Sequence, residues 1–280
     1  MPARKIDAHQ HFWNLNKVEY PWLTPELGPI YRNFEPVELE PQLRAAHIDL
    51  TVLVQAANSA DDTVSMLTQA EDYAWIGAVI GWAPLLEPDQ ARRTLERYRR
   101  HPKFRGVRHL IHNEADPDWV VRERVIEGLK VLAEFNLIFE VVAEYPNHLN
   151  HVPTLAEKVP SLTLVIDHLA KPHIKDKRVE GWAEQMAAAA GYPNVYAKIS
   201  GLNTAADWNN WSAADLKPYV DFAIEKFGAR RLMFGSDWPV CVLAGDYAKV
   251  WTETNRALEG RGQDEIKAIL GGTAERLYRL

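Results

Sequence analysis

Eight short apolar runs recur along the chain, and they restrict its possible folds more than any other feature. The runs are rich in Val, Ile and Leu without strict alternation, which is typical of parallel strands that are buried on both faces. The stretches between them have room for a helix and two loops. The sequence therefore predicts eight strand–helix units, whose strands occupy residues 6–11, 51–55, 76–82, 104–110, 137–142, 162–168, 195–200 and 231–237.

Helical spacing is clearest before the fifth predicted strand. Asp116 precedes Pro117 there, and because Asp caps helices and Pro favours the first turn, we predict that a helix begins at this point. Intervals of three and four residues then place four apolar side chains on one helical face: Val121, Val125, Leu129 and Leu132. Residues 263–280 are predicted to form a final helix, interrupted at Gly271 and Gly272.

Alternating strands and helices form either a closed barrel or an open doubly wound sheet. An open sheet usually carries a glycine-rich phosphate-binding turn after its first strand. Here Phe12, Trp13 and Asn14 follow the first strand instead. The sequence therefore favours a (β/α)₈ TIM barrel of the α/β class, expected to span residues 1–280 as one domain. Residues 13–36 are long for a loop, and we expect them to cover the catalytic mouth.

Composition excludes several classes of partner. The 280 residues include 32 Lys and Arg against 38 Asp and Glu, a formal charge of −6, whereas proteins that bind nucleic acid or anionic membranes present basic patches. No apolar run approaches the ~18–20 residues that span a bilayer. Cys241 is the single cysteine, which precludes an intrachain disulfide and fits a reducing compartment. We therefore expect a soluble, cytoplasmic protein with a small-molecule partner, its oligomeric state left open.

Polar side chains gather at the carboxyl ends of the predicted strands, where barrel enzymes place their chemistry. A His-Xaa-His pair, a third histidine and an aspartate form a cluster for which we expect catalytic roles: His9, His11, His168 and Asp237. Arg108 and Lys198 are expected to bind substrate, the alternative being that each neutralises a carboxylate. Gln55 either binds substrate or satisfies a loop backbone group. The other histidines of helices and loops are assigned to the surface: His47, His101, His112, His148, His151 and His173.

Tryptophan is frequent, with 10 in the chain. Several fall in or beside the predicted carboxyl-end loops: Trp13, Trp22, Trp82, Trp208, Trp211 and Trp238. Either they form the core of a lid, or they offer a platform for the apolar face of a sugar-derived ring whose hydroxyls the polar groups bind. Trp13 and Trp238 are the two that we assign to substrate binding.

Five segments in order resemble the amidohydrolase superfamily: IDAHQHFW from Ile6, VIDHLAKP from Val165, KISGL from Lys198, LMFGSDWPVC from Leu232 and GGTAERLY from Gly271. The combination of GSDWP with an N-terminal His-Xaa-His is specific, and the resemblance covers essentially the whole chain. It is strongest to the amidohydrolase-2 branch, which includes sugar lactonases. The resemblance implies a distorted (β/α)₈ barrel, in which the family's site residues match His9, His11, His168 and Asp237.

Departures from the superfamily pattern bear on metal binding. Many members hold two metals bridged by a modified lysine on the fourth strand, whereas this chain has Arg108 there and no histidine on its fifth strand. A two-metal site is therefore not expected. Two alternatives remain: a lactonase that requires no metal, which we favour, or a single divalent metal such as Zn²⁺ held by His9, His11, Asp237 and Glu140.

The resemblance implies a hydrolase that opens a sugar-acid lactone, an L-fucono- or similar aldonolactone, to the aldonic acid. Asp237 is the expected general base, and the three histidines are expected to stabilise the oxyanion directly or through one Zn²⁺. Three alternatives stay open: a metal-dependent decarboxylase, a lactone isomerase of the same superfamily, and a non-catalytic sugar-binding protein.

Overall fold

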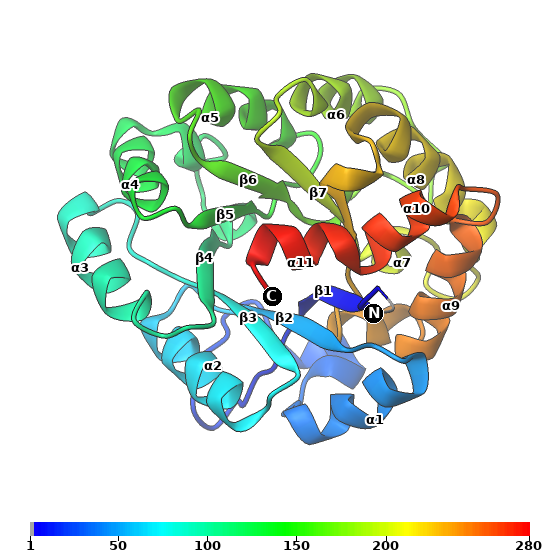
Figure 1. Ribbon diagram of the computed structural model, residues 1–280, viewed down its shortest axis with the longest axis horizontal. Coiled ribbons are helices and arrows are strands. Elements are labelled where there is room, and N and C mark those ends of the chain that lie inside the picture. The colour runs from blue at the N-terminus through cyan, green and yellow to red at the C-terminus, as the bar shows by residue number, and fades with distance from the viewer. Residues whose placement is uncertain (1–2) are drawn as a thin grey trace.

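The computed structural model of the protein describes residues 3–280 and contains an eight-stranded parallel sheet in which each strand pairs with the next along the chain (Figure 1). The apolar runs form these strands, and all eight predicted strands are confirmed with slightly different ends. Their bounds are β1 Ile6–Gln10, β2 Leu50–Val54, β3 Ile76–Gly81, β4 Phe104–His109, β5 Ile138–Val141, β6 Thr163–Ile166, β7 Val195–Ile199 and β8 Leu232–Phe234.

Helices connect the strands and surround the sheet (Figure 1). Their bounds are α1 Pro36–Ala46, α2 Ala60–Asp72, α3 Pro88–Tyr98, α4 Glu123–Glu134, α5 Val152–Lys158, α6 Trp182–Ala190, α7 Leu202–Ala205, α8 Ala213–Phe227, α9 Tyr247–Ala257, α10 Gln263–Lys267 and α11 Thr273–Tyr278. The Ser59 side chain caps α2 by accepting from the Asp61 N–H, and the Asp246 side chain caps α9 by accepting from the Lys249 N–H. Among residues 3–280, no helix combines the length and the apolar character needed to cross a membrane.

The sheet closes on itself between β1 and the segment that follows β8. The Asp237 N–H donates to the His9 carbonyl at 2.8 Å, and the His11 N–H donates to the Trp238 carbonyl at 2.7 Å. These bonds confirm the predicted barrel. The register of β1 is irregular between Asp7 and Gln10, so Asp7 bonds outward to Tyr247 of α9 whereas His9 lies inside the barrel. Such irregularities re-aim side chains beside active sites.

One predicted helix begins later than its sequence signals indicate. α4 starts at Glu123, seven residues after Asp116. The Asp116 carboxylate instead accepts from the Asp118 N–H at 3.0 Å and pairs with Arg122 at 2.6 Å, which holds a separate turn before the helix. The prediction was wrong because an Asp-Pro pair initiates turns as readily as helices.

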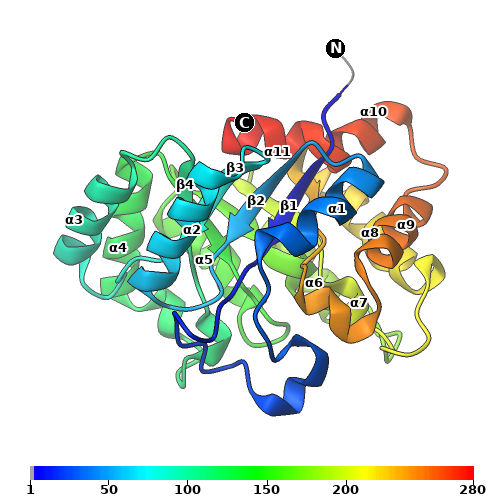
Figure 2. The same cartoon turned by 90° about the horizontal axis from the view of Figure 1, so that it is seen from below.

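The loop between β1 and α1 lies at one end of the barrel and projects below it (Figure 2). Its aromatic residues anchor it: the Trp13 Nε1–H donates to the Arg32 carbonyl at 2.7 Å, and the Trp22 Nε1–H donates to the Ala56 carbonyl beyond β2 at 2.7 Å. The Tyr20 hydroxyl donates to Asp62 of α2 at 3.1 Å. The loop therefore packs over the mouth formed by the carboxyl ends of the strands, as the sequence predicts.

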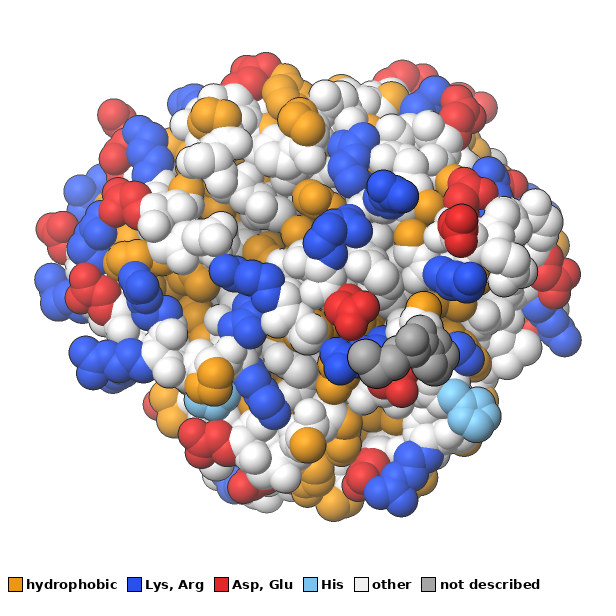
Figure 3. Space-filling model, viewed as in Figure 1, with side chains coloured by type: hydrophobic (Ala, Val, Ile, Leu, Met, Phe, Trp, Pro, Cys, Tyr) orange, Lys and Arg blue, Asp and Glu red, His pale blue; other side chains and the backbone are white. Residues whose placement is uncertain are grey.

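The opposite end of the barrel is closed by α11, which crosses the centre of the view in Figure 1. A π-type turn over Ala268–Gly272 joins α10 to α11, which confirms the interruption predicted at the two glycines. A Cβ at Gly271 would overlap the Arg4 carbonyl, so only glycine fits this approach. Charged side chains of both signs are scattered over this face (Figure 3), and Arg4 pairs with Glu275 at 3.4 Å.

The barrel interior has two halves. The half beneath α11 is apolar, because small and aliphatic side chains from the strands pack together there with Ala274 and Tyr278. The half toward the mouth is polar and contains fully buried charged groups, among them Glu140 and Lys198. The larger apolar core lies between the strands and the surrounding helices. Conventional barrels fill their interior with apolar layers, so the polar half identifies the end that carries the chemistry.

Candidate active site

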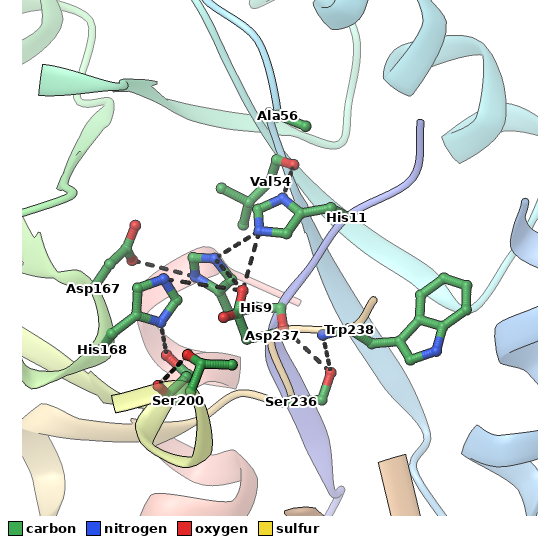
Figure 4. Close-up of polar contacts among 12 residues, drawn as sticks. His9, His11, Val54, Ala56, Asp167, His168, Ser200, Ser236, Asp237 and Trp238 are labelled. Atoms are coloured by element: carbon green, nitrogen blue, oxygen red, sulfur yellow. Dashed lines mark hydrogen bonds and ion pairs between the residues drawn. The ribbon is translucent and has the colours of Figure 1, made fainter. Parts of the chain in front are cut away.

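Four side chains that the sequence places at three different strand ends meet at the mouth (Figure 4). The Nε2 atoms of His9 and His11 lie 3.0 Å apart. The Oδ1 atom of Asp237 lies 3.7 Å from Nε2 of His9, 3.4 Å from Nε2 of His11 and 4.0 Å from Nε2 of His168. The three imidazoles therefore converge on one carboxylate oxygen, and all four side chains are buried.

The outer nitrogens of these histidines are held by fixed partners. Nδ1 of His11 lies 2.7 Å from the Val54 carbonyl, and because a carbonyl only accepts, this nitrogen carries a hydrogen. Nδ1 of His168 lies 2.9 Å from Oγ of Ser200. Such contacts orient the rings and direct each Nε2 atom toward Asp237.

The backbone at two of these positions is left-handed. Asp237 has φ 58°, and four consecutive residues after β6 have φ between 48° and 58°: His168, Leu169, Ala170 and Lys171. Left-handed backbone costs roughly 1–2 kcal/mol per residue for side chains other than glycine. Tertiary bonds hold the turn, because the Trp182 Nε1–H donates to the Leu169 carbonyl at 2.7 Å. Concentrated strain of this kind is typical of functional sites.

Gly201 completes the wall behind the cluster. Its φ is +59°, and a Cβ there would lie 2.6 Å from Nδ1 of His168 and 2.9 Å from Oδ2 of Asp237. Any larger residue would displace one of these side chains. The KISGL segment therefore needs glycine at this position both for its backbone and for the close approach of the site.

Burial sets the protonation states of the cluster. Removal from water lowers the pKa of His168 to about 4 and lowers the pKa of His9 well below its usual range, so both rings are neutral at pH 7. Burial opposes ionisation of Asp237, but its contacts with His168, His11 and His9 outweigh burial and hold the pKa of this carboxyl below its usual range. At pH 7 an ionised carboxylate thus faces the neutral rings of His9 and His168, so it is available to accept a proton.

Arg108 joins the cluster from β4. Its Nη1 atom donates to Oδ2 of Asp167 at 3.1 Å and lies 3.4 Å from Nε2 of His9. Its Nη2 atom donates to the Gln55 carbonyl. Burial opposes ionisation of Asp167, but Lys198 and His9 hold its pKa well below the usual range. Arg108 is therefore a paired cation that is fixed from two sides.

Lys198 lies deeper in the barrel and is fully buried. Its Nζ atom donates to Oε2 of Glu140 at 2.6 Å, lies 3.4 Å from Oδ1 of Asp167 and lies 3.1 Å from Nδ1 of His9. The Tyr278 hydroxyl of α11 donates to the other oxygen of Glu140 at 2.6 Å. This network connects the closed end of the barrel to the histidine cluster.

A cavity of about 110 Å³ opens beside Asp237. The polar residues of its lining are His11, Arg108, His112, His168, Lys171, Thr204 and Asp237. The apolar residues are Trp22, Ala56, Leu110, Val142 and Val240. A small ring with both polar groups and an apolar face would match this mixed lining.

The predicted substrate-binding residues differ in their position relative to this cavity. Arg108 lines it, whereas four other predicted substrate contacts are not among its lining residues in the part of the chain described: Lys198, Gln55, Trp13 and Trp238. Lys198 forms ion pairs with Glu140 and Asp167. The Gln55 amide donates to the Arg108 carbonyl at 3.1 Å. Trp13 and Trp238 pack edge to face against Phe34, which is the packing expected of a lid core.

Two histidines assigned to the surface are buried, His148 and His151, and a third lines the cavity, His112. Lys171 was not identified from the sequence either. Both cavity residues lie in the segments that follow strand ends, since His112 lies three residues after β4 and Lys171 lies in the VIDHLAKP segment after β6. Closeness to a strand end was the available signal, but the path of a loop decides whether such a side chain turns inward.

The donor set of the cluster fits one divalent cation. His9, His168 and Asp237 place ligand atoms within 4.8 Å of one another, and His11 adds a further Nε2 atom. Ligand atoms around tetrahedral Zn²⁺ lie about 3.4 Å apart, given its usual bond lengths, close to the separations described above. Glu140 belongs instead to a second group with His9 and Asp167, where the Lys198 ammonium contacts all three.

Known proteins resemble this chain over nearly its whole length. The family model described as amidohydrolase matches residues 6–280. L-fucono-1,5-lactonase from Burkholderia ambifaria is 37% identical over 99% of this chain and 96% of its own length. The enzyme of the same name from Burkholderia multivorans is 36% identical over 100% of this chain and 97% of its own length.

A solved structure extends the likeness to three dimensions. An amidohydrolase from Burkholderia multivorans with bound Zn has a TM-score of 0.93 to this protein, at 35% identity, and the match covers 99% of this chain and 100% of the other. The barrel, the His-Xaa-His pair and the full-length match lead to one assignment. The chain belongs to the amidohydrolase family.

Proposed function

We propose that the protein hydrolyses a sugar-acid lactone, L-fucono-1,5-lactone or a closely similar aldonolactone, to the open aldonic acid. The observation that carries this proposal is the buried Asp237 carboxylate, which borders a small cavity and contacts three imidazoles. The two Burkholderia lactonases, alike to this chain over their full lengths, supply the substrate class.

Asp237 is the general base of this mechanism. It accepts a proton from a water molecule, whose oxygen attacks the lactone carbonyl from the cavity. The neighbouring imidazoles favour the ionised form of the carboxyl, so the base is ready at neutral pH. When the tetrahedral intermediate collapses, the bond between the carbonyl carbon and the ring oxygen breaks. The proton held by Asp237 then passes to that oxygen, which regenerates the carboxylate.

Hydrogen-bond donors stabilise the negative charge on the carbonyl oxygen. Arg108 lines the cavity and is fixed by Asp167, so it can direct an N–H at this oxygen without reorganising. His11 and His168 line the same cavity and orient the water or the carbonyl. Lys198 acts behind them, because its contact with Nδ1 of His9 positions that ring.

A divalent cation, when bound, would be held by the Nε2 atoms of His9, His11 and His168 together with Asp237, with His168 in place of Glu140. It would supply Lewis-acid polarisation of the carbonyl. A lactone is an activated ester, and Arg108 already supplies a fixed cation at the cavity. We therefore propose that turnover does not depend on the metal.

The Asp237→Asn variant tests the assignment. Asn tolerates the left-handed backbone at this position, so the protein should fold, while kcat should fall by about 1,000-fold or more through loss of the base. Asp264→Asn, on the exposed surface of α10, is the matched control. A pH-indicator assay over a panel of aldonolactones measures turnover, and NMR of the products separates hydrolysis from isomerisation. Near wild-type kcat in Asp237→Asn would remove this residue from the role.

A further inference from the structure

Two polar residues of the cavity wall, His112 and Lys171, have no part in the mechanism. His112 comes from the short 3₁₀ turn Ile111–Asn113 that follows β4, and Lys171 ends the left-handed turn after β6. Both line the cavity. The left-handed turn thus presents His168 and Lys171, three residues apart, to the same space.

The charge of Lys171 is already compensated. Its Nζ atom donates to Oε1 of Glu144 at 2.8 Å, and both side chains are about three-fifths buried, with 38% of each exposed. Burial opposes ionisation of Glu144, but Lys171 outweighs it and lowers the pKa of this carboxyl. An ammonium group carries three donors, so Lys171 retains hydrogens for a further acceptor without offering an unpaired positive charge.

His112 complements it as a neutral group. Its Nδ1 atom is buried and has no hydrogen-bond partner among residues 3–280. Burial and the nearby Lys171 lower the pKa of His112 to about 4, so the ring is neutral at pH 7. A neutral imidazole offers one donor and one acceptor, which is what a hydroxyl group requires from its partner.

The balance of charge around the cavity points to the same kind of ligand. Arg108 is paired with Asp167 and Lys171 with Glu144, whereas the Asp237 carboxylate has only imidazoles around it. Each cation of the lining therefore has a carboxylate partner, Asp167 or Glu144, whereas Asp237 has no Lys or Arg partner among residues 3–280. A substrate with its own carboxylate would be repelled by Asp237 and would find no free cation to bind.

We propose that Lys171 and His112 are specificity-determining residues that bind the ring hydroxyls remote from the reacting carbonyl, so that the cavity selects uncharged, polyhydroxylated lactones and rejects carboxylated ones. The apolar wall around Trp22, which is fixed by its bond to the Ala56 carbonyl, packs against the face of the ring. This inference rests on the proposed lactonase activity, and it assigns the part of the site that recognises the substrate's shape.

Paired substrates test the inference. In Lys171→Met and in His112→Leu, kcat/KM for L-fucono-1,5-lactone should fall about tenfold each, mainly through KM, because each variant loses a hydrogen bond to a hydroxyl. For unsubstituted δ-valerolactone, which has no hydroxyl, kcat/KM should stay within about twofold of the wild-type value. Lys171→Arg and His112→Asn keep donors and should recover most of the loss.

A matched control and a binding measurement separate the loss of substrate binding from a general disturbance of the structure. Lys177 also has a left-handed backbone, φ 54°, but is exposed and outside the cavity lining, so Lys177→Met should leave both substrates unaffected. A 1,5-anhydroalditol, which keeps the hydroxyls and lacks the carbonyl, should show a competitive inhibition constant about tenfold weaker in Lys171→Met. This readout needs no turnover of δ-valerolactone.

Glu144 neutralises Lys171, and its replacement tests the selection against carboxylated substrates. Glu144→Gln leaves Lys171 unpaired and should raise kcat/KM for an aldaric acid lactone, which carries a carboxylate, relative to the neutral lactone. Equal losses on both substrates in Lys171→Met, or an unchanged inhibition constant, would overturn the inference. A wild-type protein that hydrolyses no lactone at all would instead overturn the proposed function.

Discussion

Replacing Lys198 by Met tests the buried network that supports the histidine cluster. The ammonium contacts three fully buried groups, Glu140, Asp167 and His9, at 2.6 to 3.4 Å. Asp167 keeps Arg108 as a partner after the substitution. Glu140 keeps only the Tyr278 hydroxyl. The variant therefore leaves one carboxylate buried without a cation, although Met fills most of the volume of the lysine chain.

The expected loss follows from that uncompensated charge. Removal of one partner from a buried ion pair lowers the free energy of unfolding by about 3–5 kcal/mol. At about 2 °C per kcal/mol for a chain of this size, Tm should fall by about 6–10 °C. Burial already raises the pKa of Glu140 despite the opposing effect of Lys198. Without Lys198 the carboxyl takes up a proton more readily, so the loss should shrink as the pH is lowered.

A double variant separates charge from packing. Glu140→Gln removes the buried charge and can still accept from Tyr278, so Lys198→Met/Glu140→Gln should be more stable than Lys198→Met alone by about 2 kcal/mol. Urea unfolding followed by circular dichroism gives the free energies, with Lys130→Met on the exposed face of α4 as the control. If the double variant loses as much as the two single variants together, the uncompensated carboxylate is not the cause of the instability.

Three further predictions concern the cluster itself. Gly201→Ala should lower kcat by about 100-fold or more, because its Cβ would lie 2.6 Å from Nδ1 of His168. It should also lower the free energy of unfolding by about 1–2 kcal/mol, because the backbone φ is +59°. Steady-state kinetics and urea unfolding measure the two effects, and a fully active variant would contradict this geometry. The folded-state pKa of His168, about 4, lies below the unfolded value of 6.5. As the pH falls, the unfolded chain therefore binds the proton first, so the contribution of His168 to the free energy of unfolding, about 3 kcal/mol above pH 6.5, should disappear by about pH 4. The free energies of unfolding of wild type and His168→Gln, measured against pH in chelator, should converge over this range. Parallel pH dependences would argue against the shift. Exhaustive chelation should leave substantial lactonase activity, whereas activity that vanishes and returns in proportion to added Zn²⁺ would show that the metal is required.

The strands were predictable because each one is a short apolar run that the barrel buries on both faces. Their ends placed His9, Arg108, His168 and Asp237 at one mouth, since parallel strands bring their carboxyl ends together. The start of α4 was not predictable from its capping signal. An aspartate can stabilise a turn or a helix equally well, and here its carboxylate contacts the Asp118 N–H and Arg122 before the helix begins.

The residues of the cavity wall could not be predicted from the sequence, for a different reason. Lys171 enters the cavity through four consecutive left-handed residues, none of them glycine, and local propensities disfavour that conformation at each position. His112 lies in a short turn whose direction depends on distant contacts. The alternation of strand residues likewise does not reveal that Lys198 is enclosed by carboxylates and does not reach the cavity.

The division of the barrel interior into an apolar and a polar half has an evolutionary consequence. Aliphatic side chains beneath α11 can exchange with others of similar volume, so related chains are free to drift there. The polar half has no such freedom, because Arg108, Asp167, Lys198 and Glu140 share partners and one replacement disturbs the charge balance of the rest. A change of substrate therefore costs least stability in the loops beyond the strands, because one replacement in the ionic half leaves a buried charge without its partner.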